Sequence, residues 1–376
     1  MKNINIKILS IILIAIGIAV FISLSQNNNS LSEQPIIKIG VILPLTGGLA
    51  NVGEEIQIAL SIAEKDLQEK YTDVEIIYED DSFDPKKSVN AFNKLAKIDN
   101  VDFIIGPLNG SSIEAVRPLA QEERVVTFTP WGAGNNIADF SFKNSVEADS
   151  ESKAILEYAS NELEMDTMAI LYLNNEWGVS HFESFRDNSS EFNIQLVASD
   201  TLNIGDSDFR TQLLKISDAN PDGIYIVHTG ALSAAVSNQT RELGIETQLL
   251  GQYGTESGQF ISTGGKNVEG TIYSFPVDEN DLTKKQINFI EEFTEIYGGK
   301  PQVAAYNAYD IYTLAIPIIN ECNREGNCIN EKIFSISNFD GVGGKFSLKS
   351  GRLERELYFK KVENGEFVSI EYAPGK

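Results

Sequence analysis

The chain has 376 residues, of which 42% are hydrophobic and 22% are charged. Because one hydrophobic core rarely fills a chain of this length, we expect two lobes. The 54 acidic residues outnumber the 30 basic residues and give a formal net charge of −24. Proteins that bind nucleic acid rely on Lys and Arg to neutralise phosphates, so this charge argues against that class of partner.

The first thirty residues have the pattern of an export signal. Lys2 and Lys7 precede an uncharged apolar run from Ile8 to Leu24, and a polar segment follows it. A basic start followed by an apolar stretch is typical of a secretory signal peptide. As a helix the run would extend roughly 26 Å, close to the ~30 Å of a bilayer core, so a retained membrane anchor is the alternative. Either interpretation of residues 1–30 places the folded body outside the cytoplasm.

The first half of the chain alternates between apolar strands and amphipathic helices. Apolar residues recur at helical spacing from Ile56 to Leu67, and Asp84 followed by Pro85 is typical of a helix start. We predict strands at 36–43, 74–78, 101–106 and 125–128. Between them we predict helices at 53–70, from 85 onward and at 113–123.

The alternation restarts after Asp149. We predict strands at 167–173, 194–199, 223–227, 248–251, 270–275, 341–348 and 357–362. Helices are predicted at 151–163, from 177 onward, and at 208–219, 231–243, 284–297 and 303–320. Strands that alternate with helices form parallel sheets covered by helices, so the fold class is α/β with a doubly wound parallel sheet in each lobe.

Small hydrogen-bonding residues follow two neighbouring strands of the first half. Beyond the carboxyl ends of parallel strands such loops face one crevice, where glycine lets the backbone approach a ligand and a helix N-terminus favours negative charge. We therefore predict a receptor for a small anion, a carboxylate. A simple helix cap is the alternative interpretation of the serines. The candidate residues are Asn109, Gly110, Ser111 and Ser112 in the first loop, and Trp131, Gly132, Ala133 and Gly134 in the second.

Three residues of the second half also follow predicted strands. Trp177 and Trp131 are the only tryptophans of the chain, and indoles make large, stiff contact surfaces in ligand sites. His228 and Thr229 follow the strand at 223–227, where the His side chain is suited to hydrogen-bonding a ligand. A partly buried tryptophan at the rim, and a histidine with a structural role, are the alternatives.

Residues that would support catalysis or metal binding are scarce. The acidic run Tyr78–Ser82 lacks the spacing of a calcium loop, so a solvated turn explains it better. The chain has two histidines and no G-x-S-x-G, H-E-x-x-H, Walker or early G-x-G-x-x-G motif. We therefore predict a protein that is not an enzyme and that uses no metal and no cofactor.

Cys322 and Cys328 are the only cysteines and flank a short segment that contains a glycine. In an oxidising exterior such a pair is typical of a local disulfide. Two free thiols or a metal site are the alternatives, although two thiols alone cannot complete a structural zinc site.

Six segments carry a family resemblance: Ile39–Gly47, Tyr78–Pro85, Phe103–Gly106, Thr129–Ala133, Tyr172–Gly178 and Phe339–Gly344. In order and spacing they resemble the branched-chain amino acid (leucine/isoleucine/valine) binding subfamily of type 1 periplasmic binding proteins, the substrate-binding proteins of ABC transporters. The resemblance covers about residues 36–372. It implies two Rossmann-like lobes, joined by three crossover strands near Ser145, Phe275 and Lys345, with a ligand cleft between them. Lobe 1 would comprise residues 36–145 and 276–344, and lobe 2 would comprise residues 146–275 and 345–372.

The resemblance also assigns roles to the candidate residues. In the family the ligand carboxylate is held by the two small-residue loops of lobe 1, an aromatic side chain of lobe 2 covers the ligand, and an acidic residue meets its amino group. Trp177 takes the place of the aromatic residue, and Thr229 stands where a second one is usual. Tyr253 aligns with the position of that acidic residue, and Glu256 follows three residues later. Either Tyr253 or Glu256 would therefore contact the ligand amino group. The residues carried over for the carboxylate are Gly110, Ser111, Gly132, Ala133 and Gly134.

The function implied is that of an extracytoplasmic solute-binding protein of an ABC importer, which captures a small amino acid or a related carboxylate or amide by closure of its lobes. Its partners would be that ligand and the membrane permease. A ligand-sensing ectodomain with the same fold is the alternative.

Overall fold

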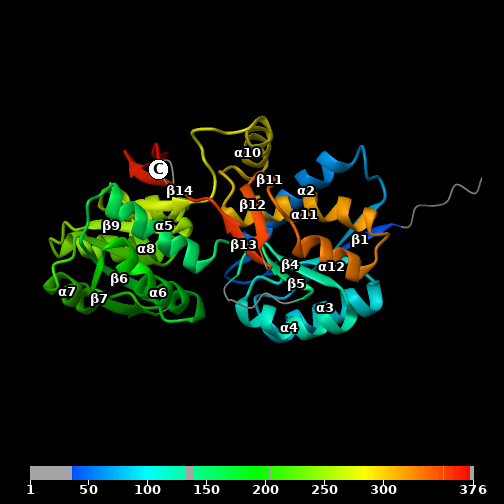
Figure 1. Ribbon diagram of the computed structural model, residues 1–376, viewed down its shortest axis with the longest axis horizontal. Coiled ribbons are helices and arrows are strands. Elements are labelled where there is room, and N and C mark those ends of the chain that lie inside the picture. Colours follow the sequence, from blue (N-terminus) through cyan, green and yellow to red (C-terminus); the bar gives the residue numbers. More distant parts are fainter. Residues whose placement is uncertain (1–35, 133–138, 204, 350, 373–376) are drawn as a thin grey trace, which may run out of the picture. The chain divides into compact units, whose positions relative to one another are not determined.

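The computed structural model describes residues 36–132, 139–203, 205–349 and 351–372, and the predicted export segment lies outside them (Figure 1). Within this described part of the chain, no helix is long and apolar enough to cross a membrane. The predicted α/β class is confirmed, because the two larger sheets are built on parallel strands with helices between them. We call the five-stranded sheet and the helices packed on it lobe 1, and the seven-stranded sheet and its helices lobe 2.

The lobe 1 sheet is parallel throughout and has the strand order β2-β1-β3-β4-β5. Its central strands are buried apolar runs, as expected for strands covered on both faces. Figure 1 shows α2 and α11 on one face of this sheet and α3 and α4 on the other. The strands are β1 (Ile37–Leu43), β2 (Val74–Asp80), β3 (Phe103–Ile105), β4 (Val126–Thr129) and β5 (Ser141–Lys143). The helices are α2 (Ala50–Leu67), α3 (Pro85–Lys94), α4 (Gly110–Glu123), α10 (Lys284–Tyr297), α11 (Val303–Glu321) and α12 (Gly326–Phe334).

The lobe 2 sheet has the order β15-β14-β10-β9-β8-β6-β7, in which β14 and β15 are antiparallel additions at one edge. Its five parallel strands repeat the arrangement of lobe 1, because the strand order again reverses beside the first strand. The strands are β6 (Thr167–Leu173), β7 (Gln195–Leu202), β8 (Gly223–Val227), β9 (Gln248–Gly251), β10 (Ile272–Phe275), β14 (Tyr358–Glu363) and β15 (Glu366–Ser369). The helices are α5 (Ala148–Asn161), α6 (Glu176–Asn188), α7 (Arg210–Asp218), α8 (Gly230–Glu242) and α9 (Gly258–Gly264).

A small third sheet lies in the chain before its last crossing from lobe 1 to lobe 2. It consists of β11 (Phe339–Gly341), β12 (Gly344–Lys349) and β13 (Arg352–Arg355), all antiparallel. Phe346 and Leu353 belong to the same core cluster as β1 and β3. The chain therefore reaches the lobe 2 sheet after Arg355, about ten residues later than the passage near Lys345 that the resemblance implies.

Most predicted elements lie within a few residues of the observed ones, and β6, β8, β9 and α10 have the predicted bounds. Asp84 caps α3 as expected, accepting hydrogen bonds from the backbone N–H groups of Lys86 and Lys87. Cys322 and Cys328 are joined in a disulfide. The helix α12 was not predicted; it begins between the two cysteines, where Gly326 and its neighbours indicate a turn rather than a helix.

Candidate functional site

The candidate residues lie at the carboxyl edges of both parallel sheets. In open α/β sheets ligands bind at this edge, beside the point where the strand order reverses. That point lies between β1 and β3 in lobe 1 and between β6 and β8 in lobe 2. The loops and first helical turns that follow β3, β4, β6, β8 and β9 carry all of the predicted site residues that the structure describes.

Asn109, rather than a serine, caps the helix after β3. Its Oδ1 accepts hydrogen bonds from the backbone N–H of Ser111 at 3.2 Å and from the Ser111 hydroxyl at 2.9 Å, while its Nδ2 donates to the carbonyl oxygen of Phe83. The helix thus begins at Gly110, so that Gly110 and the exposed Ser111 form its first turn at the edge of the sheet.

Ser112 is hydrogen-bonded in the interior of lobe 1, and its place among the ligand residues stays a prediction. Its side chain is fully buried, and its hydroxyl hydrogen-bonds that of Ser88, which in turn donates to Asp81. One residue further along a helix turns a side chain by about 100°. Ser111 therefore stays at the surface, whereas Ser112 faces α3.

Gly132 brings the loop after β4 against the loop after β3. Its φ is +157°, and a Cβ atom there would lie 2.9 Å from the Leu108 carbonyl oxygen and 2.7 Å from the Ile113 side chain. Only glycine allows this approach. Trp131 precedes it and packs, partly exposed, on the lobe 1 core near Phe83. Ala133 and Gly134 lie outside the described residues.

Trp177 stands in the first turn of α6, directly after β6. Asn175 caps this helix by accepting a hydrogen bond from the backbone N–H of Gly178. A Cβ atom on Gly178 would lie 1.9 Å from the Leu173 carbonyl oxygen, so the turn requires glycine. The indole of Trp177 is partly exposed and lies edge to face with the His181 ring, 4.8 Å between centroids.

His228 has a ring nitrogen without a hydrogen-bond partner. Its Nδ1 lies 2.7 Å from the backbone N of Thr229 and 3.1 Å from the Thr229 carbonyl oxygen, so this nitrogen has a partner in either tautomer of the ring. Nε2 is buried and has no hydrogen-bond partner in the described part of the chain. Burial lowers the pKa of His228, which keeps the ring neutral, while the Thr229 side chain is exposed.

Tyr253, in the loop after β9, has its side chain beside that of Trp131 from the loop after β4. Its backbone N–H donates to Glu151 at 3.0 Å. Burial raises the pKa of the Tyr253 hydroxyl, with a smaller contribution from Glu151, so the hydroxyl stays protonated. Tyr253 therefore presents a neutral phenol at this edge of the sheet.

Glu256 is engaged in the interior of lobe 2. Its two carboxylate oxygens lie 2.8 and 2.7 Å from Nζ of Lys360, and the Tyr273 hydroxyl donates to it at 2.7 Å. Lys360 is fully buried and also pairs with Glu279 at 2.9 Å. This arrangement favours a structural role for Glu256 over contact with a ligand ammonium group.

The sequence prediction missed two buried residues behind the site, Glu151 and His181. Glu151 lies on the buried face of α5, in register with Ile155 and Ala159, and His181 lies one helical turn after Trp177. An acid in the apolar stripe of a helix is a signal that the sequence offered, because a carboxylate is almost never buried without a partner.

Comparison with known proteins identifies the family. A family model described as "Periplasmic binding protein" matches residues 36–366. The chain belongs to this family. A curated relative, the Leu/Ile/Val-binding protein homolog 3 of Brucella melitensis biotype 1, is 24% identical over 256 residues, which are 66% of this chain and 68% of the relative. The predicted resemblance to the branched-chain amino acid binding subfamily is thus confirmed.

Solved structures of periplasmic binding proteins share the fold. A branched-chain amino acid transporter substrate-binding protein from Streptococcus pneumoniae, in complex with isoleucine, has a TM-score of 0.78 at 20% identity, covering 88% of this chain and 97% of that one. A solute-binding protein of an ABC transporter from Rhodopseudomonas palustris BisB5, in complex with 3,4-dihydroxybenzoic acid, has a TM-score of 0.80 at 20% identity, covering 90% and 96%.

The acidic run Tyr78–Ser82 connects the loop after β1 to the loop after β2 through hydrogen bonds. Although desolvation opposes ionisation of Asp80, hydrogen bonds from Thr46 and from backbone N–H groups of Ser82 and Leu45 lower its pKa to about 2. Asp81 accepts hydrogen bonds from Ser88 and from the backbone of Phe83. Across the described residues, no group of three or more side chains is arranged to hold a metal ion.

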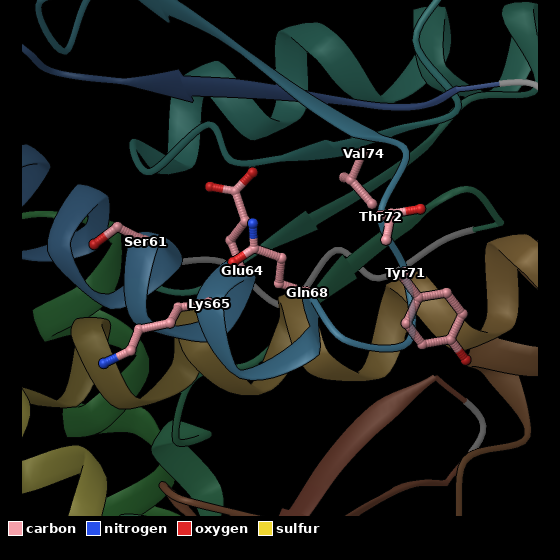
Figure 2. Close-up of a pocket in the computed structure, with 7 residues that line it drawn as sticks. All are labelled: Ser61, Glu64, Lys65, Gln68, Tyr71, Thr72 and Val74. Carbon is pink, nitrogen blue, oxygen red and sulfur yellow. The ribbon is translucent and has the colours of Figure 1, made fainter.

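Figure 2 shows a surface hollow of about 280 Å³ that is separate from these loops. It lies beside the second half of α2 and the start of β2, which is the amino edge of the lobe 1 sheet. None of the candidate residues lines it. Its lining consists of Ser61, Glu64, Lys65, Gln68, Tyr71, Thr72 and Val74.

Proposed function

We propose that this periplasmic binding protein is the extracytoplasmic solute-binding component of an ABC importer, which captures a small carboxylate or amide between its lobes and delivers it to a membrane permease. The contact between Trp131 of lobe 1 and Tyr253 of lobe 2 is the main support, because it brings together loops from the carboxyl edges of both sheets. Closure of two lobes on a ligand buries the ligand and creates a new surface for a partner. This function needs no chemical step.

The candidate residues suit a ligand with an anionic or carbonyl end. Gly110 and Ser111 form the first turn of a 14-residue helix, where the helix dipole favours negative charge. Nε2 of His228 is a buried polar atom without a partner in the described part of the chain, and a polar group of the ligand would supply one. Isoleucine and 3,4-dihydroxybenzoic acid, the ligands of the two solved relatives, both carry a carboxylate.

The opposite end of the ligand is proposed to lack an ammonium group. Tyr253 is a phenol at the position where the family has an acid, and the carboxylate of Glu256 is paired with Lys360. An ammonium group there would lose its hydration without gaining a carboxylate, which is costly. A plain carboxylate, an amide or a urea-like solute avoids this cost.

Calorimetric titration with a matched panel tests the proposal. The panel pairs each α-amino acid with the carboxylate that lacks the amino group, and adds aromatic carboxylates, short amides and urea. We expect binding of a carboxylate or amide, and weaker binding of its amino acid partner. Failure of every compound to bind at millimolar concentration would count against a solute-binding function, whereas tightest binding of an amino acid would contradict the proposed ligand class.

Trp177→Ala is expected to weaken binding of the panel ligand at least tenfold, about 1.4 kcal/mol, because it removes the aromatic surface that covers the ligand. The measurement is the dissociation constant by titration, with thermal unfolding to show that the variant is folded. Tyr71→Ala is the matched control, since Tyr71 is a partly buried aromatic residue at the opposite edge of lobe 1. Equal affinities of wild type and Trp177→Ala would exclude Trp177 from the site.

A further inference from the structure

We propose that Glu151 and His181 form a buried positioning pair that fixes Trp177 and Tyr253 in the orientations they need to contact the ligand. The ligand contact rests on the proposed function, whereas the fixing of the two aromatic residues does not. Neither residue of the pair is placed to touch a ligand, because both side chains are 1% exposed or less.

Glu151 connects three elements of lobe 2. One carboxylate oxygen accepts hydrogen bonds from the backbone N–H of Tyr253, at 3.0 Å, and from the hydroxyl of Ser274 on β10. The other oxygen lies 3.0 Å from Nε2 of His181 on α6. A single carboxylate on α5 thus holds the loop after β9 and the first turns of α6 in a fixed relation.

His181 holds both the backbone and the ring of Trp177. Its Nδ1 lies 2.8 Å from the Trp177 carbonyl oxygen, which can only accept, so Nδ1 carries a proton. Its ring packs edge to face against the indole at 60°. Because Nε2 faces the Glu151 carboxylate at the same time, the imidazole cannot rotate without breaking two hydrogen bonds.

Packing alone does not account for this pair. Apolar side chains of similar volume often stabilise a core as well as, or better than, a buried ion pair. Apolar contacts do not fix the orientation of a neighbouring group, whereas hydrogen bonds of defined geometry do. Here the hydrogen bonds of Glu151 and His181 orient Trp177 and Tyr253, the two aromatic residues of the candidate site that belong to lobe 2. The geometry of the site therefore depends on residues beneath it.

Fluorescence of Trp177 tests the positioning without any ligand. In a Trp131→Phe background Trp177 is the only indole, so acrylamide quenching and anisotropy decay report its exposure and motion. His181→Gln keeps an amide N–H that reaches Glu151 but loses the bond to Trp177, and we expect at least twofold faster quenching. His181→Asn keeps a donor to the Trp177 carbonyl, and we expect a smaller change.

Two further variants keep the test decisive. Phe185→Leu alters a fully buried residue on the same helix that is not bonded to Trp177, so it is expected to lower stability without altering the quenching. Ser274→Ala removes one hydrogen bond to Glu151 by a mild change and is expected to give an intermediate effect, which serves if the His181 variants do not fold. Unchanged quenching in folded His181→Gln would overturn the inference. If the His181 variants do not fold, unchanged quenching in Ser274→Ala would overturn it. A change in quenching in Phe185→Leu as large as that in His181→Gln would overturn it as well.

Affinity for the panel ligand, measured with Trp131 intact, gives the second readout. We expect His181→Gln to weaken binding at least tenfold and Phe185→Leu to change it less than twofold. A loosened Trp177 with unchanged affinity would contradict the ligand-directed role. Failure of wild type to bind any panel compound would count against the proposed function instead, and the quenching would still decide whether the pair fixes Trp177.

Discussion

Replacing Lys360 with methionine is expected to destabilise the protein by about 3–5 kcal/mol, the usual cost of removing one partner from a buried ion pair. The Lys360 side chain is fully buried, with Nζ 2.7 Å from Glu256 and 2.9 Å from Glu279. Burial alone would raise the pKa of Glu279, but Lys360 and Lys300 outweigh it and hold that pKa below its ordinary value. Methionine would fill the space and leave Glu256 without its cation and Glu279 with Lys300 alone.

Lys361→Met is the matched control. This neighbouring lysine is 38% exposed and pairs with Glu363 at the surface, where an ion pair contributes at most about 1 kcal/mol. Denaturant unfolding of both variants near neutral pH gives the comparison. A cost for Lys360→Met no larger than that for Lys361→Met would show that the buried cluster does not stabilise the fold as argued.

Removing the carboxylates as well separates charge from packing. In the Lys360→Met background, Glu256→Gln removes an unpaired charge and is expected to recover part of the lost stability, whereas Glu279→Gln also gives up the pair with Lys300 and is expected to recover less. In the wild-type background Glu256→Gln is expected to leave ligand affinity unchanged within about twofold, since its carboxylate is engaged with Lys360 and Tyr273. A large loss of affinity would return Glu256 to the candidate site.

The order of elements was predictable because it depends on local pattern. β6 and β8 are apolar runs bounded by polar turns, and α10 begins with a capping box at Thr283. The short elements were missed because their local pattern is weak. β13 has four residues and a polar, alternating pattern, and α12 begins with a glycine beside a disulfide-bonded cysteine, so neither has a local signal that outweighs a loop.

The candidate site was predictable in its position but not in its polar partners. The carboxyl ends of predicted strands identify Trp131, Trp177 and His228, because parallel sheets gather these ends at one edge. The partners of Glu151 and Glu256 are distant in sequence: Ser274 is 123 residues from Glu151, and Lys360 is 104 residues from Glu256. No pattern in a single sequence encodes such pairs. Ser112 is different, because its register with Val116 and Ala120 on the buried face of α4 was visible in the sequence.

Asp310 is expected to make stability fall as the pH rises from about 4 to about 6. This aspartate of α11 is fully buried, and its oxygens accept hydrogen bonds from the backbone N–H groups of Val342, at 2.6 Å, and Gly343, at 2.9 Å. Burial raises its pKa to about 6, although Arg355 and these N–H groups oppose the rise. Glu55, whose pKa is raised to about 7 chiefly by burial, acts in the same direction at slightly higher pH.

The sign follows from proton binding. Between the unfolded pKa of 3.8 and the folded pKa of about 6, the folded protein holds a proton on Asp310 that the unfolded chain has released. The stabilisation is therefore complete below pH 4 and is lost as the pH passes through 6, with a total of about 3 kcal/mol at most. Asp310→Asn removes the titration, so the wild-type stability minus that of the variant should decrease across this range, measured by denaturant unfolding in steps of half a pH unit. Glu55→Gln is the control: it keeps Asp310, so the stability of this variant should still fall between pH 4 and 6. If the stability of wild type and of Asp310→Asn changes with pH in parallel, Asp310 stays ionised in the folded protein across this range and the prediction is wrong.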